Sequence, residues 1–191
     1  MNEETLSSGF FGEDITLDIY TDLKEFYTPA NGFSRLHLCR RYGKLHILKS
    51  LQPFYSSQEF YKQLLLKEFN IGYQLDHPNI RHTLGWEKND LLGNYIVLEY
   101  IDGIPLTTFI EQGKLTQALA YKFITEICNA LQYIHSKQLI HKDLKPNNIL
   151  ITHNGNNVKL IDFGLADCDD YEILKIPAGT EKYLAPEQLN P

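Results

Sequence analysis

The pattern of apolar residues changes near residue 100, and this change constrains the fold more than any other feature of the chain. Before it, short apolar runs separated by turns predict strands at Phe33 to Cys39, Leu45 to Lys49 and Asn94 to Tyr100, the first two joined by a hairpin turn at Arg41 to Lys44. After it, apolar residues at helical spacing following Thr116 predict one long helix; they are Leu119, Phe123, Ile127, Leu131 and Ile134. A strand-rich half followed by a helical half indicates an α+β chain with two lobes, joined near residues 99 to 104.

Three further elements are predicted from local signals. Ser56, followed three residues later by Glu59, is typical of a capping box, so we expect a helix to begin there and to continue through Ile71. A short amphipathic helix is expected over Leu17 to Phe26, within an acidic lead segment at residues 1–27. Two short strands are expected around a turn at Asn154 to Asn156; they are Ile149 to Ile151 and Val158 to Ile161.

Composition excludes several classes of protein. The 191 residues have a net charge of −6, which argues against a nucleic-acid binder that neutralises phosphates. The apolar fraction of 43% is enough for a packed core and excludes a largely disordered chain. No run of 18 apolar residues exists, so we expect no membrane association, and the acidic N-terminus is unlike a secretory signal. Three widely spaced cysteines form no C-x-x-C pair, so we expect reduced thiols and a cytoplasmic location.

Residues that could do chemistry gather in one polar segment, and others stand at set distances from it. The segment and its companions are His141-Lys142-Asp143-Leu144-Lys145-Pro146-Asn147-Asn148, then Asp162-Phe163-Gly164, Gly179-Thr180 and Ala185-Pro186-Glu187. Upstream, Lys49 lies in a predicted strand and Glu68 in a predicted helix. Each of these alone would be an exposed charge or a turn. In this order across residues 28 to 190, they closely resemble the eukaryotic-type serine/threonine protein kinases.

This resemblance implies a bilobal protein-kinase-like fold. The expected N-lobe, at residues 28–101, has a small antiparallel sheet and one main helix, and residues 102–191 form a partial, mostly helical C-lobe. The chain stops at Pro191, directly after the Ala-Pro-Glu motif, where the family continues with further helices. We therefore expect a truncated kinase domain, in which a partner or a missing C-terminal segment covers the exposed apolar faces.

The resemblance also implies a set of site residues, with ATP and Mg²⁺ as cofactors. Asp143 is expected to act as the catalytic base, and Lys145 to stabilise charge on the transferring phosphoryl group. Asn148 and Asp162 are the expected metal ligands, which suffice because Mg²⁺ completes its shell with water and phosphate oxygens. The residues expected to bind ATP are Lys49, Glu68, Leu36, Ile47, Leu98, Glu99, Ile101 and Leu150. Within this set, Glu68 is expected to pair with Lys49 and hold its ammonium beside the phosphates, and Glu99 and Ile101 are expected to offer backbone groups to the adenine.

Several positions depart from the family pattern. The phosphate-binding loop, expected at Pro29 to Leu36, keeps the aromatic Phe33 but has none of the three glycines in place, so we expect weaker nucleotide binding. Ile47 stands where the family has a small alanine above the adenine. Gly72 and Thr83 replace bulky apolar residues of a packed spine, so we expect looser packing there.

The segment following the Asp-Phe-Gly motif has two interpretations. Lys142 replaces an arginine that in the family commonly binds a phosphorylated activation loop, and between Leu165 and Ala178 there is no Ser or Thr. Four acidic residues lie there instead: Asp167, Asp169, Asp170 and Glu172. These carboxylates either stand in for a phosphate opposite Lys142 or form a solvated acidic loop.

Three functions remain open on the sequence alone. The first is an ATP- and Mg²⁺-dependent kinase that acts on Ser or Thr hydroxyls of a protein substrate, and the retention of Lys49, Asp143, Asn148 and Asp162 favours it. The second is a non-catalytic, kinase-like binding or scaffold module, which the loop without the family's three glycines in place favours. The third is a kinase for small molecules, which the Lys145-Pro146 and Ala-Pro-Glu motifs disfavour.

Overall fold

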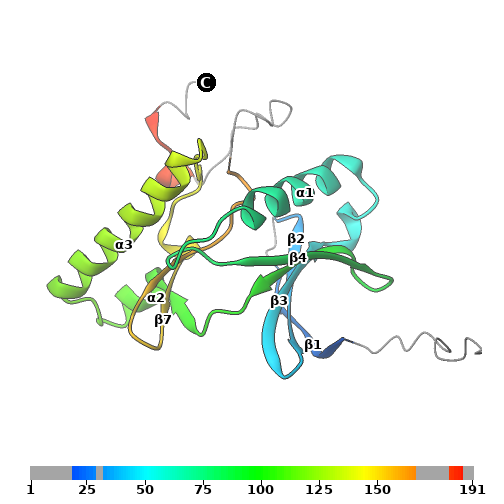
Figure 1. Cartoon of the computed structure of the whole chain (residues 1–191), viewed down its shortest axis with the longest axis horizontal. Helices are drawn as coiled ribbons and strands as arrows, with labels where there is room; N and C mark the ends of the chain where they lie inside the picture. The colour runs from blue at the N-terminus through cyan, green and yellow to red at the C-terminus, as the bar shows by residue number, and fades with distance from the viewer. Residues whose placement is uncertain (1–18, 29–31, 167–180, 187–191) are drawn as a thin grey trace, which may run out of the picture.

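The computed structural model describes residues 19–28, 32–166 and 181–186 in two lobes (Figure 1). The first lobe has a five-stranded antiparallel sheet in the order β1-β2-β3-β5-β4, and the second has a three-stranded sheet in the order β6-β7-β8. The strands are β1 Tyr20–Tyr27, β2 Ser34–Arg41, β3 Lys44–Leu51, β4 Thr83–Asn89, β5 Gly93–Glu99, β6 Gly103–Pro105, β7 Ile149–Thr152 and β8 Val158–Leu160. The helices are α1 Glu59–Tyr73, α2 Leu106–Glu111 and α3 Gln117–Ser136, with 3₁₀ turns η1 Pro53–Tyr55, η2 Pro146–Asn148 and η4 Glu181–Tyr183. The bilobal α+β fold predicted from the sequence is confirmed.

The β2–β3 hairpin forms where the turn residues predicted it. Arg41 pairs with Lys44, and the two residues between them have positive φ angles, 49° for Tyr42 and 78° for Gly43. Two successive residues of positive φ match the twist of the flanking strands, which is why such short turns close hairpins. In the resulting register, Leu36 lies opposite Lys49. Lys49 belongs to β3, which is the middle strand of the sheet.

The helix predicted over Leu17 to Phe26 is wrong, because Tyr20–Tyr27 forms the edge strand β1 and pairs antiparallel with β2. Two register irregularities interrupt this pairing, and all of β1 except Tyr20 is exposed. Strand β1 therefore lacks the alternation of a half-buried strand, and its pairing with β2 decides its conformation. The sheet begins at Tyr20, earlier than the predicted N-lobe boundary at residue 28.

Helix α1 begins at Glu59, three residues after the predicted N-cap Ser56. Its N-cap is Gln58, which makes no side-chain capping bond, and the hydroxyl of Ser56 instead donates to the carbonyl of Pro53 at 2.7 Å. The predicted capping box is therefore wrong, because Ser56 completes the preceding 3₁₀ turn. The residues that α1 buries are Leu64, Leu65, Lys67, Glu68, Ile71 and Gly72.

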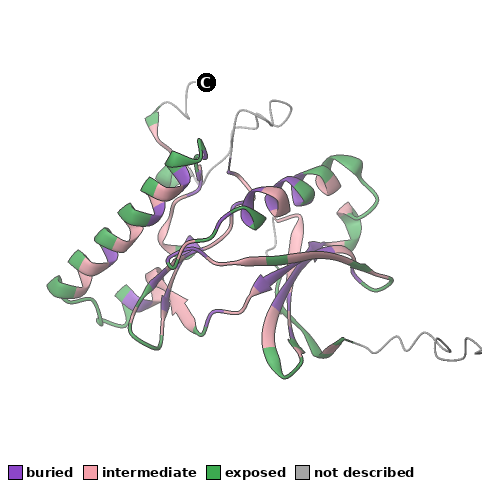
Figure 2. Cartoon of the chain, viewed as in Figure 1, coloured by how far each residue is buried: buried purple, intermediate pink, exposed green. Residues whose placement is uncertain are grey.

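Helix α3 matches its prediction. The Thr116 hydroxyl caps it by accepting from the backbone N–H of Leu119 at 3.3 Å. The predicted stripe packs into the core of the second lobe, with Phe123 and Ile134 buried and the other members partly buried. Figure 2 shows exposed residues along the outer side of α1 and α3 and buried ones towards the inside of each lobe. Among the described residues, no helix combines the length and apolar content needed to cross a bilayer.

Gly72 and Thr83 fit against each other where looser packing was predicted. A Cβ added to Gly72 would overlap the hydroxyl oxygen of Thr83, which lies at the start of β4. Because residue 72 has no side chain, the Thr83 hydroxyl fills the space beside it. The two small residues therefore share one close contact, and the expected loss of packing along the spine stays a prediction.

Candidate active site

A buried ion pair joins strand β3 to helix α1. Lys49 Nζ lies 2.6 Å from Glu68 Oε1, and the two side chains are only 7% and 5% exposed. Strand alternation turns Lys49 to the face shared by Ile47 and Leu51, against which α1 packs through Leu65. The two residues predicted to pair are therefore in contact.

Asp162 completes this network from the second lobe. Its Oδ1 accepts a hydrogen bond from Lys49 Nζ at 3.0 Å. The ammonium of Lys49 holds the pKa of Asp162 well below its usual range, against the effect of burial. Burial alone would lower the pKa of Lys49, but Asp162 and Glu68 raise it. Burial raises the pKa of Glu68, and Lys49 opposes that shift. At neutral pH, Asp162 therefore presents an anionic carboxylate beside a cation.

The polar segment from His141 to Asn148 places two site residues, Lys145 and Asn148, around the carboxylate of a third, Asp143. The side-chain amide of Asn148 donates to the backbone carbonyl of Asp143 at 2.9 Å and to its Oδ2 at 2.8 Å. Lys145 Nζ lies 2.7 Å from the same Oδ2. Asp143 and Asn148 are both buried. These bonds fix the orientation of the Asn148 amide, with its nitrogen towards Asp143, so its Oδ1 can serve as the ligand to a cation.

Two strained backbone positions bring the two clusters together. The backbone N–H of Ile161 donates to the carbonyl of Asn148 at 3.0 Å, which sets Asp162 beside the loop. Lys142 and Asp162 have φ angles of 61° and 67°, a conformation that side-chain-bearing residues rarely adopt. Such strain is kept only where the surrounding contacts hold it, and it recurs at functional sites.

Two further residues of the packed spine, His141 and Phe163, contact each other. The rings of His141 and Phe163 lie 4.9 Å apart, and both residues are buried. Burial lowers the pKa of His141, so the imidazole is neutral and packs as an aromatic ring. This contact places Phe163, and with it Asp162, against the polar segment that contains Asp143 and Asn148.

The residues expected around the adenine divide into two groups. Leu36, Ile47 and Leu98 lie in one apolar cluster beneath the sheet, with Ile47 directly opposite Leu98. Ile101 is buried just beyond the end of β5. Leu150 is half-buried in β7, between neighbours that point into the second core. Nothing in these contacts tests nucleotide binding, so all of these roles stay predictions.

Glu99, predicted to offer backbone groups to the adenine, is fixed at both its backbone and its side chain. Its N–H donates to the carbonyl of His82 at 3.0 Å, and its carboxylate accepts from the N–H of His82 and from Lys159. The Glu99 backbone carbonyl is therefore the group of this residue best suited to a ligand.

Two residues of the site were missed by the sequence reasoning. Gly164 leaves no room for a side chain, because an added Cβ would lie 3.1 Å from Glu68 Oε2 and 3.3 Å from Asp162 Oδ1. Arg81, held by a 2.9 Å bond from its N–H to Leu160, brings a second positive charge that lowers the pKa of Asp162. The Asp-Phe-Gly motif could have signalled the first residue, but a lone arginine in a loop gives no such signal.

The phosphate-binding loop and the segment after the Asp-Phe-Gly motif are described only in part. Residues 29–31 lie outside the described residues, as do the acidic residues Asp167, Asp169, Asp170 and Glu172, and the predictions for them stay predictions. At the described end of the phosphate loop, Gln52 Nε2 donates to the carbonyl of Gly32 at 2.6 Å, and the Gln52 N–H donates to that of Phe33 at 2.8 Å.

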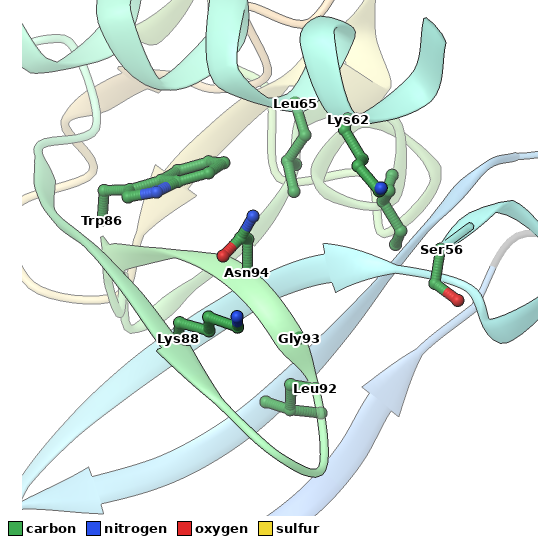
Figure 3. A pocket seen from close by; sticks show the side chains of 9 residues that line it. Ser56, Lys62, Leu65, Trp86, Lys88, Leu92, Gly93 and Asn94 are labelled. Carbon is green, nitrogen blue, oxygen red and sulfur yellow. The ribbon is translucent and has the colours of Figure 1, made fainter. Parts of the chain in front are cut away.

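A separate pocket of about 220 Å³ lies between α1 and the β4–β5 hairpin. Figure 3 shows Lys62 and Leu65 reaching from the helix towards Trp86, Lys88 and Asn94 on the strands. None of the predicted site residues lines it, so it is distinct from the network around Lys49.

The family model described as the protein kinase domain matches residues 32–191. This chain therefore belongs to the protein kinase domain family, in agreement with its fold and with the residues gathered around Lys49 and Asp143. It is 40% identical over 131 residues to the serine/threonine-protein kinase RUNKEL of Arabidopsis thaliana, which covers 66% of this chain. It is 34% identical over 150 residues, or 78% of the chain, to the serine/threonine-protein kinase ppk25 of Schizosaccharomyces pombe. It is 33% identical over 177 residues, or 90% of the chain, to the cAMP-dependent protein kinase catalytic subunit 3 of Drosophila melanogaster.

The chain spans only part of these relatives. The aligned residues cover 9% of RUNKEL, 35% of ppk25 and 29% of the Drosophila subunit. The likeness therefore establishes the domain, and the activity of the whole protein is a matter for proposal.

Proposed function

We propose that this chain transfers the γ-phosphoryl group of ATP to a serine or threonine hydroxyl of a protein, in an Mg²⁺-dependent reaction. One observation carries the proposal: the buried pair of Lys49 and Glu68 and the half-buried Asp162 form a single network that a backbone bond links to Asn148 and Asp143. Phosphoryl transfer needs positioning and charge neutralisation more than covalent chemistry, and these groups supply both.

Each residue has a role that fits its surroundings. Lys49, fixed by two carboxylates, holds its ammonium in one place to receive phosphate oxygens. Asp143 accepts the proton of the substrate hydroxyl, and Lys145, 2.7 Å from that carboxylate, stabilises the charge on the transferring group.

The donor set fits Mg²⁺. Asn148 offers a neutral amide oxygen of fixed orientation, and Asp162 offers a carboxylate kept ionised by Lys49. Oxygen ligands of this kind, few in number, are what Mg²⁺ uses in phosphoryl-transfer sites. When bound, the ion neutralises charge on the phosphates. The serine/threonine preference rests on Lys145 and on the names of the relatives.

A second function, a non-catalytic kinase-like module, is favoured by two observations. Both Lys145 and Asn148 already contact the carboxylate oxygen Oδ2 of Asp143, and the phosphate loop has none of the family's three glycines in place. If binding of nucleotide does not loosen these contacts, Asp143 is a poor base and the domain serves for binding alone.

The two functions are separated by nucleotide binding and phosphotransfer measured on matched variants. We expect ATP to raise the melting temperature more with Mg²⁺ than without it, and the wild-type protein to phosphorylate a generic protein substrate. Asp162→Asn should abolish the Mg²⁺-dependent part of both signals, whereas Asp90→Asn, the same change at an exposed residue of the β4–β5 turn, should alter neither. Mg²⁺-dependent binding without transfer would favour the binding module, and transfer that survives in Asp162→Asn would contradict the metal assignment.

A further inference from the structure

Four aromatic side chains form an unbroken series of ring contacts that joins the end of the phosphate-binding loop to the first turn of α1 and then to η1. This aromatic ladder consists of Phe33, Tyr61, Tyr55 and Phe54. The ring centroids of Phe33 and Tyr61 are 5.5 Å apart, those of Tyr61 and Tyr55 are 4.5 Å apart, and those of Tyr55 and Phe54 are 5.1 Å apart. Tilted and edge-to-face rings at these distances attract one another beyond the effect of apolar burial.

The ladder joins three elements that are separate in the sequence. Phe33 immediately precedes β2, Tyr55 belongs to η1 after β3, and Tyr61 is in α1. Phe33 and Tyr61 also pack on the apolar cluster beneath the sheet. Gln52, next to η1, adds hydrogen bonds from its backbone and side chain to the carbonyls of Phe33 and Gly32. The end of the loop is therefore held by both rings and hydrogen bonds.

Tyr61 and Glu68 act on the same face of α1. They are seven residues apart, which is about two helical turns, so both side chains face the sheet. Glu68 holds the middle of the helix through Lys49, and Tyr61 holds its first turn through Phe33. A movement of α1 that lengthens one contact therefore disturbs the other.

We propose that the aromatic ladder couples the phosphate-binding loop to helix α1, with Tyr61 as the positioning residue that holds Phe33 in place. This inference rests on the proposed function, since the binding it controls is that of Mg²⁺-ATP. A loop that has none of the family's three glycines in place adapts less freely to phosphates, so it gains from being held in place before the nucleotide arrives. Coupling of this kind is reciprocal: nucleotide in the site favours the inward position of α1, and inward α1 favours nucleotide.

The experiment compares matched tyrosine variants of one helix in the full-length protein. Mg²⁺-ATP binding is titrated calorimetrically for Tyr61→Ala and Phe33→Ala, and for Tyr61→Phe, which keeps the ring. The control is Tyr73→Ala, the same substitution at the far end of α1, where the ring is 60% exposed and contacts Phe69. Amide hydrogen exchange over residues 59–66 is measured without nucleotide in the wild type and in Phe33→Ala.

We expect Tyr61→Ala and Phe33→Ala each to raise the Kd for Mg²⁺-ATP by about two- to tenfold, the range that corresponds to one aromatic contact. Tyr61→Phe and Tyr73→Ala should stay within about twofold of the wild type. Because each single change breaks the same contact, the double variant should bind no more weakly than either one. Exchange over residues 59–66 should be faster in Phe33→Ala.

Different results overturn the ladder and the proposed function. An unchanged Kd in Tyr61→Ala, or additive losses in the double variant, overturns the coupling even if the protein is an active kinase. If the wild type binds no Mg²⁺-ATP, the proposed function fails, and the hydrogen exchange decides the mechanical link by itself. Faster exchange in α1 upon loss of the Phe33 ring then supports the link, and unchanged exchange overturns it.

Discussion

Replacing Lys49 by methionine should destabilise the protein more than removing either of its carboxylate partners. Lys49 lies between two acids, at 2.6 Å from Glu68 and 3.0 Å from Asp162, so its loss leaves two neighbouring carboxylates without their shared cation. Loss of one partner from a buried pair costs about 3–5 kcal/mol, and we expect Lys49→Met to fall in this range.

The two carboxylate variants should cost less, and by different amounts. In Glu68→Gln, Lys49 keeps Asp162 as a partner, so we expect a loss of about 1–3 kcal/mol, below that for an unpaired buried charge. The Asp162 side chain is 44% exposed, so water screens its contact, and Asp162→Asn should cost under about 1 kcal/mol. The expected order of destabilisation is therefore Lys49→Met, then Glu68→Gln, then Asp162→Asn.

Urea denaturation followed by tryptophan fluorescence measures this order. Trp86 is the one tryptophan among the 191 residues, and its ring lies 5.5 Å from that of Phe69 on α1, so it reports on the packing that the ion pair supports. With a slope of about 2 kcal/mol per molar urea, a loss of about 4 kcal/mol lowers the midpoint by about 2 M.

A double variant tests the cause. Lys49→Met together with Glu68→Gln removes both members of the buried pair, so it should be more stable than Lys49→Met alone. The reasoning is refuted if the double variant loses the sum of the two single losses, or if Asp162→Asn is as destabilising as Lys49→Met. Either result would mean that packing, rather than unpaired charge, sets the cost.

Three further changes address single contacts. Gly164→Ala should destabilise the protein by about 1–3 kcal/mol and reduce phosphotransfer, because the new methyl group would press on the Glu68 carboxylate. Urea midpoints and initial rates of phosphotransfer measure these effects, and unchanged values would contradict the prediction. Asn148→Leu removes the two hydrogen bonds to Asp143, so it should abolish Mg²⁺-dependent nucleotide binding, as measured by calorimetry, and lower the free energy of unfolding by about 1–3 kcal/mol, as measured by denaturation. Retained Mg²⁺ dependence would exclude Asn148 as a ligand. Burial raises the pKa of Cys39 to about 11, so at pH 8 a thiol reagent should leave it unmodified in the folded protein, as peptide mapping by mass spectrometry would show; rapid modification would contradict its burial.

The sequence predicted those elements whose signals are local. Positive-φ residues at Tyr42 and Gly43 define the hairpin within four residues, and the Thr116 hydroxyl caps a helix whose apolar stripe lies next to it. The site residues were found in another way, because their short motifs resemble those of the protein kinases. The contact between Lys49 and Glu68 is longer in range, but family resemblance supplied it.

Two of the features that were predicted wrongly or missed depend on partners that are distant in the sequence, and one depends on a choice between local partners. Strand β1 contains residues that suit a helix as well as a strand, and it is exposed, so only its pairing with β2 decides its conformation. The Ser56 hydroxyl could either accept from a backbone N–H of the helix or donate to a carbonyl, and the 3₁₀ turn before it provided the carbonyl of Pro53. The aromatic ladder escaped detection because Phe33, Tyr55 and Tyr61 come from three elements and share no spacing.

Three contacts on one face of α1 hold the helix against the sheet, although one residue of the packed spine on this helix is a glycine. Tyr61, Glu68 and Gly72 are separated by seven and four residues, so all three face the sheet. A bulky apolar residue at the third position would hold the helix by dispersion contacts, but here the absent Cβ makes room for the hydroxyl of Thr83. A larger side chain at residue 72 would therefore displace the Thr83 hydroxyl or push α1 away from β4, so the fit of Gly72 against Thr83 belongs to the packing around the contact between Glu68 and Lys49.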